Sequence, residues 1–388
     1  MSNNQLKTIF NQEVITDLAQ RITTVLPSFE SIGFEQDANQ NLDNLELKQR
    51  STQICTALIS YLPSEFEKAA SILIQAMGED DKSGGIEGYN GFRFMPFLDF
   101  VAVRGLDNPE IALDSLEKMT LHFSGEFAIR PFILKHPDIT LPRLMKWTSY
   151  QDWRVRRLAS EGSRPRLPWG TQLKPFIENP SFVIEILHQL YNDSNLVVRR
   201  SVANNLNDIA KDNPADAVET AQSWWDCGDE TARWTVRHAL RSLVKQGNKQ
   251  ALSILGFIGG DNIRVENFQF QSSVVMIGEE LNFFCNLVSE ELGKVHLVVD
   301  YILHRVLANG KLSKKVFKLK QIELSPGEKI TLSVKHKFKQ LSTRTYYPGI
   351  HNIELIVNGR SIGKYDFELI ENLGLQQGLK LIIAKVSI

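Results

Sequence analysis

The sequence predicts an α-α superhelix followed by an all-β sandwich, and three observations lead to this fold class. Apolar residues recur at three- and four-residue steps from residue 14 to about 257, and Pro, Gly, Asn and Asp stand at the breaks. Within this region, similar helices recur at a regular interval. After Gly259-Gly260 the pattern changes to period-two alternation, which is typical of strands buried on one face.

The first part of the chain is predicted to be helical throughout. The periodicity predicts helices over residues 14–25, 44–61, 64–77, 93–104, 108–122, 126–135, 140–149, 152–162, 181–191, 195–211, 214–226, 230–246 and 249–256. The Gly-rich segment DKSGGIEGYNG (81–91) is expected to be a loop. Because this segment contains no GKS or GKT and follows no strand, we do not expect it to hold a phosphate.

Three helical segments resemble one another. DWRVRRLASE begins at residue 152, DSNLVVRRSVANN at 193 and DETARWTVRHALRS at 229, so the offsets are 41 and 36 residues. Each segment opens with an acid and continues into a helix that contains Val-Arg. Paired helices with a period near 40 residues are typical of HEAT-like repeats, which stack into a solenoid with an extended surface.

The last part of the chain is predicted to be an immunoglobulin-like sandwich. Strands are expected over residues 263–271, 281–288, 295–306, 314–324, 330–338 and 351–359. Turns are expected at Asn309-Gly310, at Ser325-Pro326-Gly327 and at Asn358-Gly359. About seven short strands in a segment of this length favour such a sandwich. The predicted domains are therefore 1–259 for the HEAT-like repeats and 260–370 for the sandwich, with a tail of unknown structure over 371–388.

Composition and charge limit the classes of protein to which the chain can belong. A hydrophobic content of 43% and a charged content of 23% exclude a disordered or fibrous chain. No apolar run approaches the ~18 residues of a membrane span, so no membrane partner is expected. The N-terminus does not resemble a secretory signal and the three cysteines are scattered, which favours the cytoplasm. The net charge of −1 divides into −10 over residues 1–129, +5 over 130–250 and +4 over 251–388. A basic surface suited to a polyanion therefore follows an acidic first third.

The repeat helices combine rows of cations with single acids. Side chains three or four residues apart share one helix face, which gives the stripes Arg154-Arg157-Glu161-Arg164, Arg200-Asn204-Asp208 and Arg237-Arg241-Lys245. Each stripe alone is often only a solvated face, and Glu161 or Asp208 alone is more often a salt-bridge partner than a catalytic group. Acids repel phosphates, however, so an acid within a phosphate-binding groove is expected only where the function requires its negative charge.

Cleavage of a glycosidic bond is a function that requires such a negative charge. Its transition state resembles an oxocarbenium ion, which a carboxylate stabilises while it orients a water molecule. A base that is already cationic through alkylation needs no general acid to leave. The eight histidines form no HxxxH or HExxH pair, so no metal is expected, and we expect no cofactor. No lysine lies in a motif that suggests a Schiff-base lyase, which fits a glycosylase that leaves an abasic site.

Four segments resemble the AlkC branch of the HEAT-repeat DNA glycosylases, which are related to AlkD. They are TLHFSGEFAIRPFI (120–133), LASEGSRPRLPWG (158–170), SVANNLNDIAKDNP (201–214) and WTVRHALRSLVKQGNKQALSILGF (234–257). The likeness is close from about residue 120 to 257 and weaker over 1–119. Many AlkC-like chains carry an Ig-like domain after the repeats, as this chain is expected to do.

The resemblance implies a monofunctional DNA N-glycosylase that excises cationic alkylated bases. 3-Methylcytosine and 1-methyladenine are the implied substrates, with 3-methyladenine as a further candidate, and alkylated double-stranded DNA is the implied partner. Such an enzyme would act in the cytoplasm of a bacterial-type cell, at the nucleoid, and we expect a monomer.

The resemblance also carries over to particular residues. It implies catalytic roles for Asp208, Glu161 and Glu126, and contact of Trp169 with the lesion nucleotide. Glu126 could also serve only as a helix cap after Ser124, and Trp169 could simply fill the edge of the repeat. The residues expected to bind DNA phosphates are Arg154, Arg157, Arg164, Arg166, Arg199, Arg200, Arg237 and Arg241.

Two other functions remain open at this point. The chain could be a non-catalytic HEAT-repeat protein that binds damaged or branched DNA, although such a protein gains nothing from Glu161 and Asp208 within the groove. It could also be a protein-binding solenoid with an adhesive sandwich domain, which would show no salt-dependent affinity for DNA.

Overall fold

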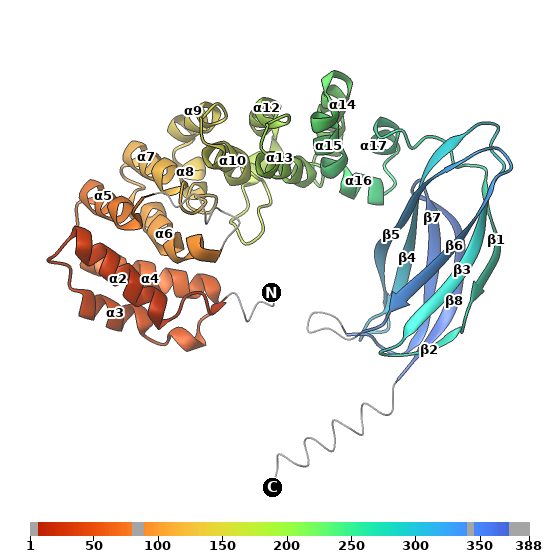
Figure 1. Ribbon diagram of the computed structural model, residues 1–388, viewed down its shortest axis with the longest axis horizontal. Helices are drawn as coiled ribbons and strands as arrows, with labels where there is room; N and C mark the ends of the chain where they lie inside the picture. The colour runs from red at the N-terminus through yellow and green to blue at the C-terminus, as the bar shows by residue number, and fades with distance from the viewer. Residues whose placement is uncertain (1–6, 80–88, 340–344, 372–388) are drawn as a thin grey trace, which may run out of the picture. The chain divides into compact units, whose positions relative to one another are not determined.

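The protein consists of two compact units, Met1–Leu240 and Arg241–Ile388 (Figure 1). The computed structural model describes residues 7–79, 89–339 and 345–371. Most of the predicted loop 81–91, and the predicted tail from residue 372 onward, lie outside the described residues. No helix in the described ranges has both the length and the apolar character that crossing a membrane requires.

The first unit is built from helices that follow one another along the chain. They are α2 (Gln12–Val25), α3 (Ser31–Asn39), η1 (Leu42–Asn44), α4 (Leu47–Tyr61), α5 (Phe66–Met77), η2 (Tyr89–Phe94), α6 (Met95–Arg104), α7 (Pro109–Met119), α8 (Arg130–Lys135), α9 (Pro137–Trp147), α10 (Trp153–Gly162), α11 (Lys174–Glu178), α12 (Ser181–Leu190), α13 (Leu196–Ile209), α14 (Pro214–Cys227) and α15 (Glu230–Ala239).

These helices stack in two layers, as expected of a HEAT-like solenoid (Figure 1). In one layer α10 packs on α13 and α13 packs on α15, while α5, α7 and α9 pack in succession in the other. A helix such as α10 therefore buries its apolar stripe between its neighbour α13 in its own layer and α9 and α12 in the other layer. The predicted α-α superhelix is confirmed.

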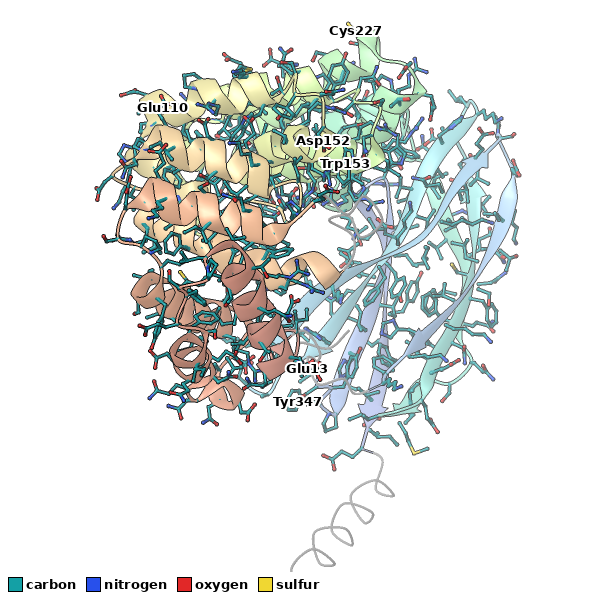
Figure 2. All side chains as sticks on the ribbon, turned by 60° about the vertical axis from the view of Figure 1, so that its left-hand side comes forward. Glu13, Glu110, Asp152, Trp153, Cys227 and Tyr347 are labelled. Atoms are coloured by element: carbon teal, nitrogen blue, oxygen red, sulfur yellow. The ribbon has the colours of Figure 1, made fainter. Side chains whose placement is uncertain are left out.

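The three repeat segments begin in the same way. The side chains of Asp152, Asn195 and Asp229 accept hydrogen bonds from backbone N–H groups in the first turns of α10, α13 and α15. This N-capping compensates for donors that the helix itself leaves unpaired. Figure 2 marks the start of α10 with Asp152 and Trp153. The periodic acid of the sequence is thus the cap of α10 and of α15, whereas α13 is capped by Asn195, two residues after the acid Asp193.

Some helices differ from the prediction. The predicted helix 230–246 is interrupted at Leu240, where α15 ends and α16 (Arg241–Lys245) begins. The pattern also missed α3 and α11. Only Phe34 and Ala38 are buried in α3, and α11 is a five-residue turn of helix that contains Pro175, so neither shows a long apolar stripe.

The second unit combines two short helices with a sandwich of two sheets. Its helices are α16 and α17 (Lys249–Ile254), and its strands are β1 (Ile263–Phe270), β2 (Val274–Met276), β3 (Glu280–Ser289), β4 (Val295–Val306), β5 (Leu312–Leu324), β6 (Lys329–Lys337), β7 (Gly349–Val357) and β8 (Arg360–Ile370). One sheet has the order β1-β3-β6 and the other β2-β8-β7-β4-β5. The predicted sandwich is confirmed, although β2 and β8 were not predicted. The two compact units divide after Leu240, so α16 and α17 group with the strands. The predicted domain boundary after residue 259 stays a prediction.

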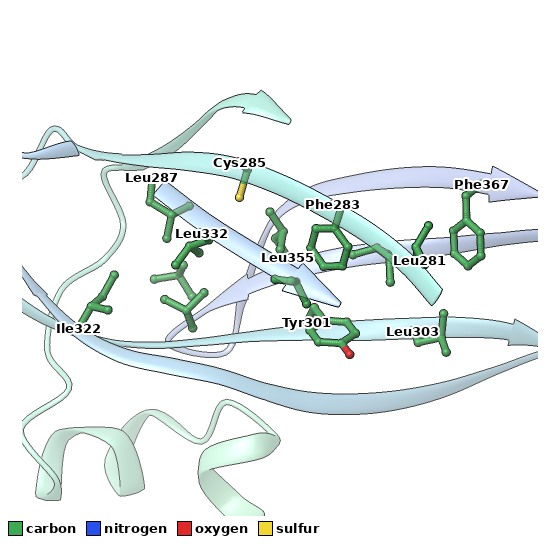
Figure 3. Packing of buried hydrophobic residues seen from close by; sticks show 14 of the residues in the cluster. Leu281, Phe283, Cys285, Leu287, Tyr301, Leu303, Ile322, Leu332, Leu355 and Phe367 are labelled. Carbon is green, nitrogen blue, oxygen red and sulfur yellow. The ribbon is translucent and has the colours of Figure 1, made fainter. Parts of the chain in front are cut away.

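The sandwich core lies between the two sheets (Figure 3). Phe283, Cys285 and Leu287 alternate along β3 and point inward toward β4, where Tyr301 and Leu303 line the opposite sheet. The buried Cys285 is a free thiol. At the hairpin between β7 and β8, Asn358 and Gly359 both have positive φ, which is the turn that Asn-Gly predicts.

Candidate active site

The close packing of α10 against α13 brings two acids together. Small polar residues line this contact, where Ser201 Oγ donates to Ser160 Oγ and Asn205 Nδ2 donates to the carbonyl of Ser160. Glu161 ends the polar stripe of α10 and Asp208 ends that of α13, and both side chains are buried. The helix ends therefore place two carboxylates at neighbouring points of adjacent repeats.

Acids and cations alternate in one continuous network. Arg157 Nη1 donates to Glu126 Oε2 over 2.7 Å, and its Nη2 lies 3.8 Å from Glu161 Oε1. Arg164 then joins Glu161 to Asp208, at 2.7 Å from each carboxylate. Lys211 Nζ ends the network at 2.7 Å from Asp208 Oδ1. All three acids that the sequence singled out therefore lie in one cluster, although Glu126 comes from the loop before α8.

The neighbouring cations keep Glu161 ionised. Burial alone would raise the pKa of the Glu161 carboxyl, but the charges of Arg157 and Arg164 outweigh burial and lower that pKa below its ordinary value. Burial likewise opposes the charges of Arg157 and Arg164, yet the neighbouring carboxylates raise the pKa of both guanidinium groups. At neutral pH Glu161 is thus an anion, as a group must be if it is to stabilise positive charge.

Arg130 is a further cation at this site, and the sequence did not indicate it. Its side chain is fully buried, where Nη1 donates to the Gly162 carbonyl and Nε donates to the Thr171 carbonyl. Within the described residues its Nη2 has no hydrogen-bond partner. Burial, followed by the charge of Arg164, lowers the pKa of Arg130 to about 10, while the three site carboxylates act in the opposite direction. Arg130 therefore adds positive charge behind the acids and fastens the chain that leads to Trp169.

Trp169 presents its ring to solvent from a strained backbone. Its φ is +64°, in the left-handed region that bulky side chains rarely adopt, and the residue is 57% exposed. Lys48 of α4 donates to the Trp169 carbonyl over 2.6 Å, and its Nζ lies 4.6 Å from the centre of the Phe127 ring. Next in the chain, a Cβ on Gly170 would lie 3.1 Å from Leu167 and 3.3 Å from Arg130. The loop is thus held on both sides while the ring is left uncovered.

The predicted phosphate-binding arginines fall into two groups. Arg154 is buried and donates to Asp152 and to the Leu121 carbonyl, which is a structural setting. Arg157 and Arg164 are bound to the site acids, and Arg166 pairs with Asp212 through two hydrogen bonds.

The remaining arginines lie further along the solenoid. Arg199 lies over the ring of Trp234, and Arg237 lies over Trp225 and pairs with Glu230. Arg200 is exposed and makes no ion pair with the part of the chain that the structure describes. Arg241 begins α16 and so belongs to the second unit.

The sequence analysis did not select Arg130, Lys48 or Lys211. Lys211 could have been found from its i, i+3 spacing to Asp208 in the predicted helix 195–211, although the structure places it in the turn after α13. Across the described residues, no group of three His, Cys, Asp or Glu side chains is suited to holding a metal ion.

Comparisons with known proteins agree with the architecture. Residues 264–371 match the family model described as the C-terminal Ig-like domain of uncharacterised protein YhaZ. The chain is 35% identical to uncharacterized protein YhaZ of Bacillus subtilis over 94% of its own length and 99% of that protein. The Pseudomonas fluorescens alkylpurine DNA glycosylase AlkC, solved bound to DNA containing an abasic site analog, aligns with a TM-score of 0.87. That alignment has 34% identity and covers 94% of this chain and 99% of AlkC. The chain therefore belongs to the AlkC branch of the HEAT-like-repeat DNA glycosylases, and it carries the Ig-like domain found in YhaZ.

Proposed function

We propose that this protein is a monofunctional DNA glycosylase that hydrolyses the N-glycosidic bond of cationic alkylated bases. The observation that carries the proposal is the cluster of Glu126, Glu161 and Asp208, which Arg157 and Arg164 join, in a chain that aligns with AlkC over nearly its full length. A protein that only binds DNA would gain affinity, not lose it, if these acids were neutral.

The proposed reaction needs no metal and no covalent intermediate. The bond between C1′ and the base nitrogen breaks, and its electron pair neutralises the cationic base as it leaves. The sugar then carries positive charge, which Asp208 and Glu161 stabilise at close range. A water oxygen bonds to C1′ and releases its proton, so the products are a neutral free base and an abasic site.

Trp169 and the exposed arginines are assigned to binding. The Trp169 ring is proposed to lie against the lesion nucleotide, because it is a large aromatic surface that the protein leaves exposed on the loop after α10, which Arg130 binds at the Thr171 carbonyl. Arg200 and its neighbours Arg199 and Arg237 are proposed to contact phosphates, as is Arg166. We exclude Arg154 from the proposed contacts, because its guanidinium is already enclosed by Asp152 and Leu121.

A direct assay tests the proposal. Duplex oligonucleotides with a single 3-methylcytosine, 1-methyladenine or 3-methyladenine are incubated with excess protein and then treated with alkali, which cuts the strand at abasic sites. Cleavage at the modified position is expected, and the description of AlkC as an alkylpurine glycosylase favours the two methylated adenines as first substrates. Tight, salt-dependent binding without cleavage of any of the three would favour the non-catalytic DNA-binding protein.

A further inference from the structure

Both oxygens of the Asp208 carboxylate are occupied in the free protein. Oδ2 accepts from Nε of Arg164 at 2.8 Å and lies 2.7 Å from its Nη2, and Oδ1 accepts from Lys211 Nζ at 2.7 Å. The Asp208 side chain is only 3% exposed, so little of it faces solvent. In this state two cations share the charge of the carboxylate and Oδ1 is bound to Lys211, whereas the proposed function requires the carboxylate to approach a sugar or to orient a water molecule.

The two partners of Asp208 differ in how readily they can leave. Arg164 is 9% exposed and binds Glu161 as well, so its departure would leave two buried carboxylates without a partner. Lys211 is 46% exposed, and the bond to Asp208 is the one hydrogen bond of its ammonium group among the described residues. Water can solvate the half-exposed ammonium group of Lys211 when it leaves, so the cost of separating this pair falls on Asp208, which keeps Arg164 as a partner. Lys211 is therefore the partner that can be exchanged.

We propose that Lys211 is a phosphate-binding residue that leaves Asp208 when DNA binds and thereby frees Oδ1 for the reaction. This inference rests on the proposed function. The nearest anions to a nucleotide's sugar are its own two phosphates, which are bonded to the oxygens on C3′ and C5′. A lysine within reach of an acid at that sugar is thus also within reach of a flanking phosphate, given its flexible four-carbon chain.

The exchange links binding to catalysis. In the free protein Lys211 neutralises Asp208, so the acid does not repel approaching phosphates. Once a phosphate takes the ammonium group, the charge of Asp208 is no longer shared with Lys211 and can act on the developing sugar cation. Arg164 continues to hold Oδ2 and keeps the carboxylate in position.

Two measurements on Lys211→Met test the proposal, since methionine keeps much of the side-chain volume and removes the charge. Binding to a duplex that contains an abasic-site analogue is measured against salt, and single-turnover excision is measured at saturating protein. The expected result is a log–log salt slope that is smaller by about one unit, with a single-turnover excision rate that falls by less than about tenfold. Lys211→Arg should restore the slope, and Lys118→Met, on α7 in the other helix layer, should not change it.

Two results would overturn the proposal. A wild-type salt slope in Lys211→Met would show that the lysine contacts no phosphate. A tenfold or larger fall in its single-turnover rate would show that Lys211 stays on Asp208 throughout the reaction. If the wild-type protein releases none of the three bases, the proposed glycosylase function fails, whereas the salt slope still tests the phosphate contact separately.

Discussion

The cations around the acids of the first unit and the cations on the edge of the sandwich look alike in the sequence but differ in the structure. Arg157 and Arg164 are buried and bound to carboxylates. Lys314, Lys318 and Lys320 of the edge strand β5 are exposed and form no ion pair within the described ranges. Buried paired cations hold acids in place, and exposed unpaired cations are available to phosphates. A basic row therefore has no single meaning until the partners of its members are known.

The largest effect is expected at Asp208, the acid that Arg164 and Lys211 bind. Asp208→Asn should abolish base excision, because the amide cannot stabilise a sugar cation, while DNA affinity stays the same or rises slightly. Removing a negative charge near phosphates cannot weaken binding electrostatically. Single-turnover excision and equilibrium binding on the same alkylated duplex check both parts, and a near-normal excision rate would refute the assignment.

Glu161→Gln should slow excision by about 10²–10⁴-fold, as is common when one positioned catalytic group is lost. It should also change how stability depends on pH. Because the pKa of Glu161 is lowered in the folded protein, its charged form stabilises the fold above the unfolded pKa, and this contribution is lost as pH falls through the folded value. The stability difference between wild type and variant should thus be larger at pH 7 than at pH 3 in urea unfolding. A constant difference would contradict the assigned ionisation.

Replacing Lys314, Lys318 and Lys320 together by Ala should weaken binding to alkylated and undamaged duplexes equally and lower the salt slope by up to about three units. Excision at saturating protein should be unchanged, because these side chains belong to the unit without the acid cluster. The control replaces Lys329 and Lys337 of β6 together by Ala. Because these two lysines pair with Glu266 and Glu280, their loss should lower the salt slope less. Equal slopes for the triple variant and the wild type would remove the sandwich from the proposed DNA contacts.

The smallest effects are expected for two arginines that the sequence analysis assigned to the same role, the binding of DNA phosphates. Arg200→Ala should lower the salt slope by about one unit without changing stability, since the side chain is exposed and unpaired within the described residues. Arg154→Ala should leave the slope unchanged and lower the free energy of unfolding, because it leaves Asp152 and the Leu121 carbonyl without a buried partner. Salt-dependent binding and urea unfolding of both variants measure the difference. A lower salt slope for Arg154→Ala and a wild-type slope for Arg200→Ala would show that exposure does not indicate which arginine binds phosphate.

Much of the fold and part of the site were predictable from local pattern. The 3.6-residue period predicted most of the helices of the first unit, and the i, i+4 spacing predicted that Glu161 shares one helix face with Arg157. Partners from distant segments were not predictable in this way. The pairing of Arg154 with the Leu121 carbonyl and the contact of Lys48 with Trp169 join residues that only the packing of the solenoid brings together. A fully buried arginine such as Arg130 also has no distinct sequence signal, because arginine on a helix is ordinarily exposed.

The backbone of Trp169 has a consequence for attempts to improve the protein. A large side chain at a φ of +64° costs on the order of 1 kcal/mol, and an exposed ring recovers little of that through burial. Glycine or asparagine at this position would relieve the strain, so heat-resistance screening would tend to enrich such replacements. A programme that selected survivors by melting temperature alone would then discard the ring proposed to meet the lesion. At this position the more durable protein and the more active one are expected to be different proteins.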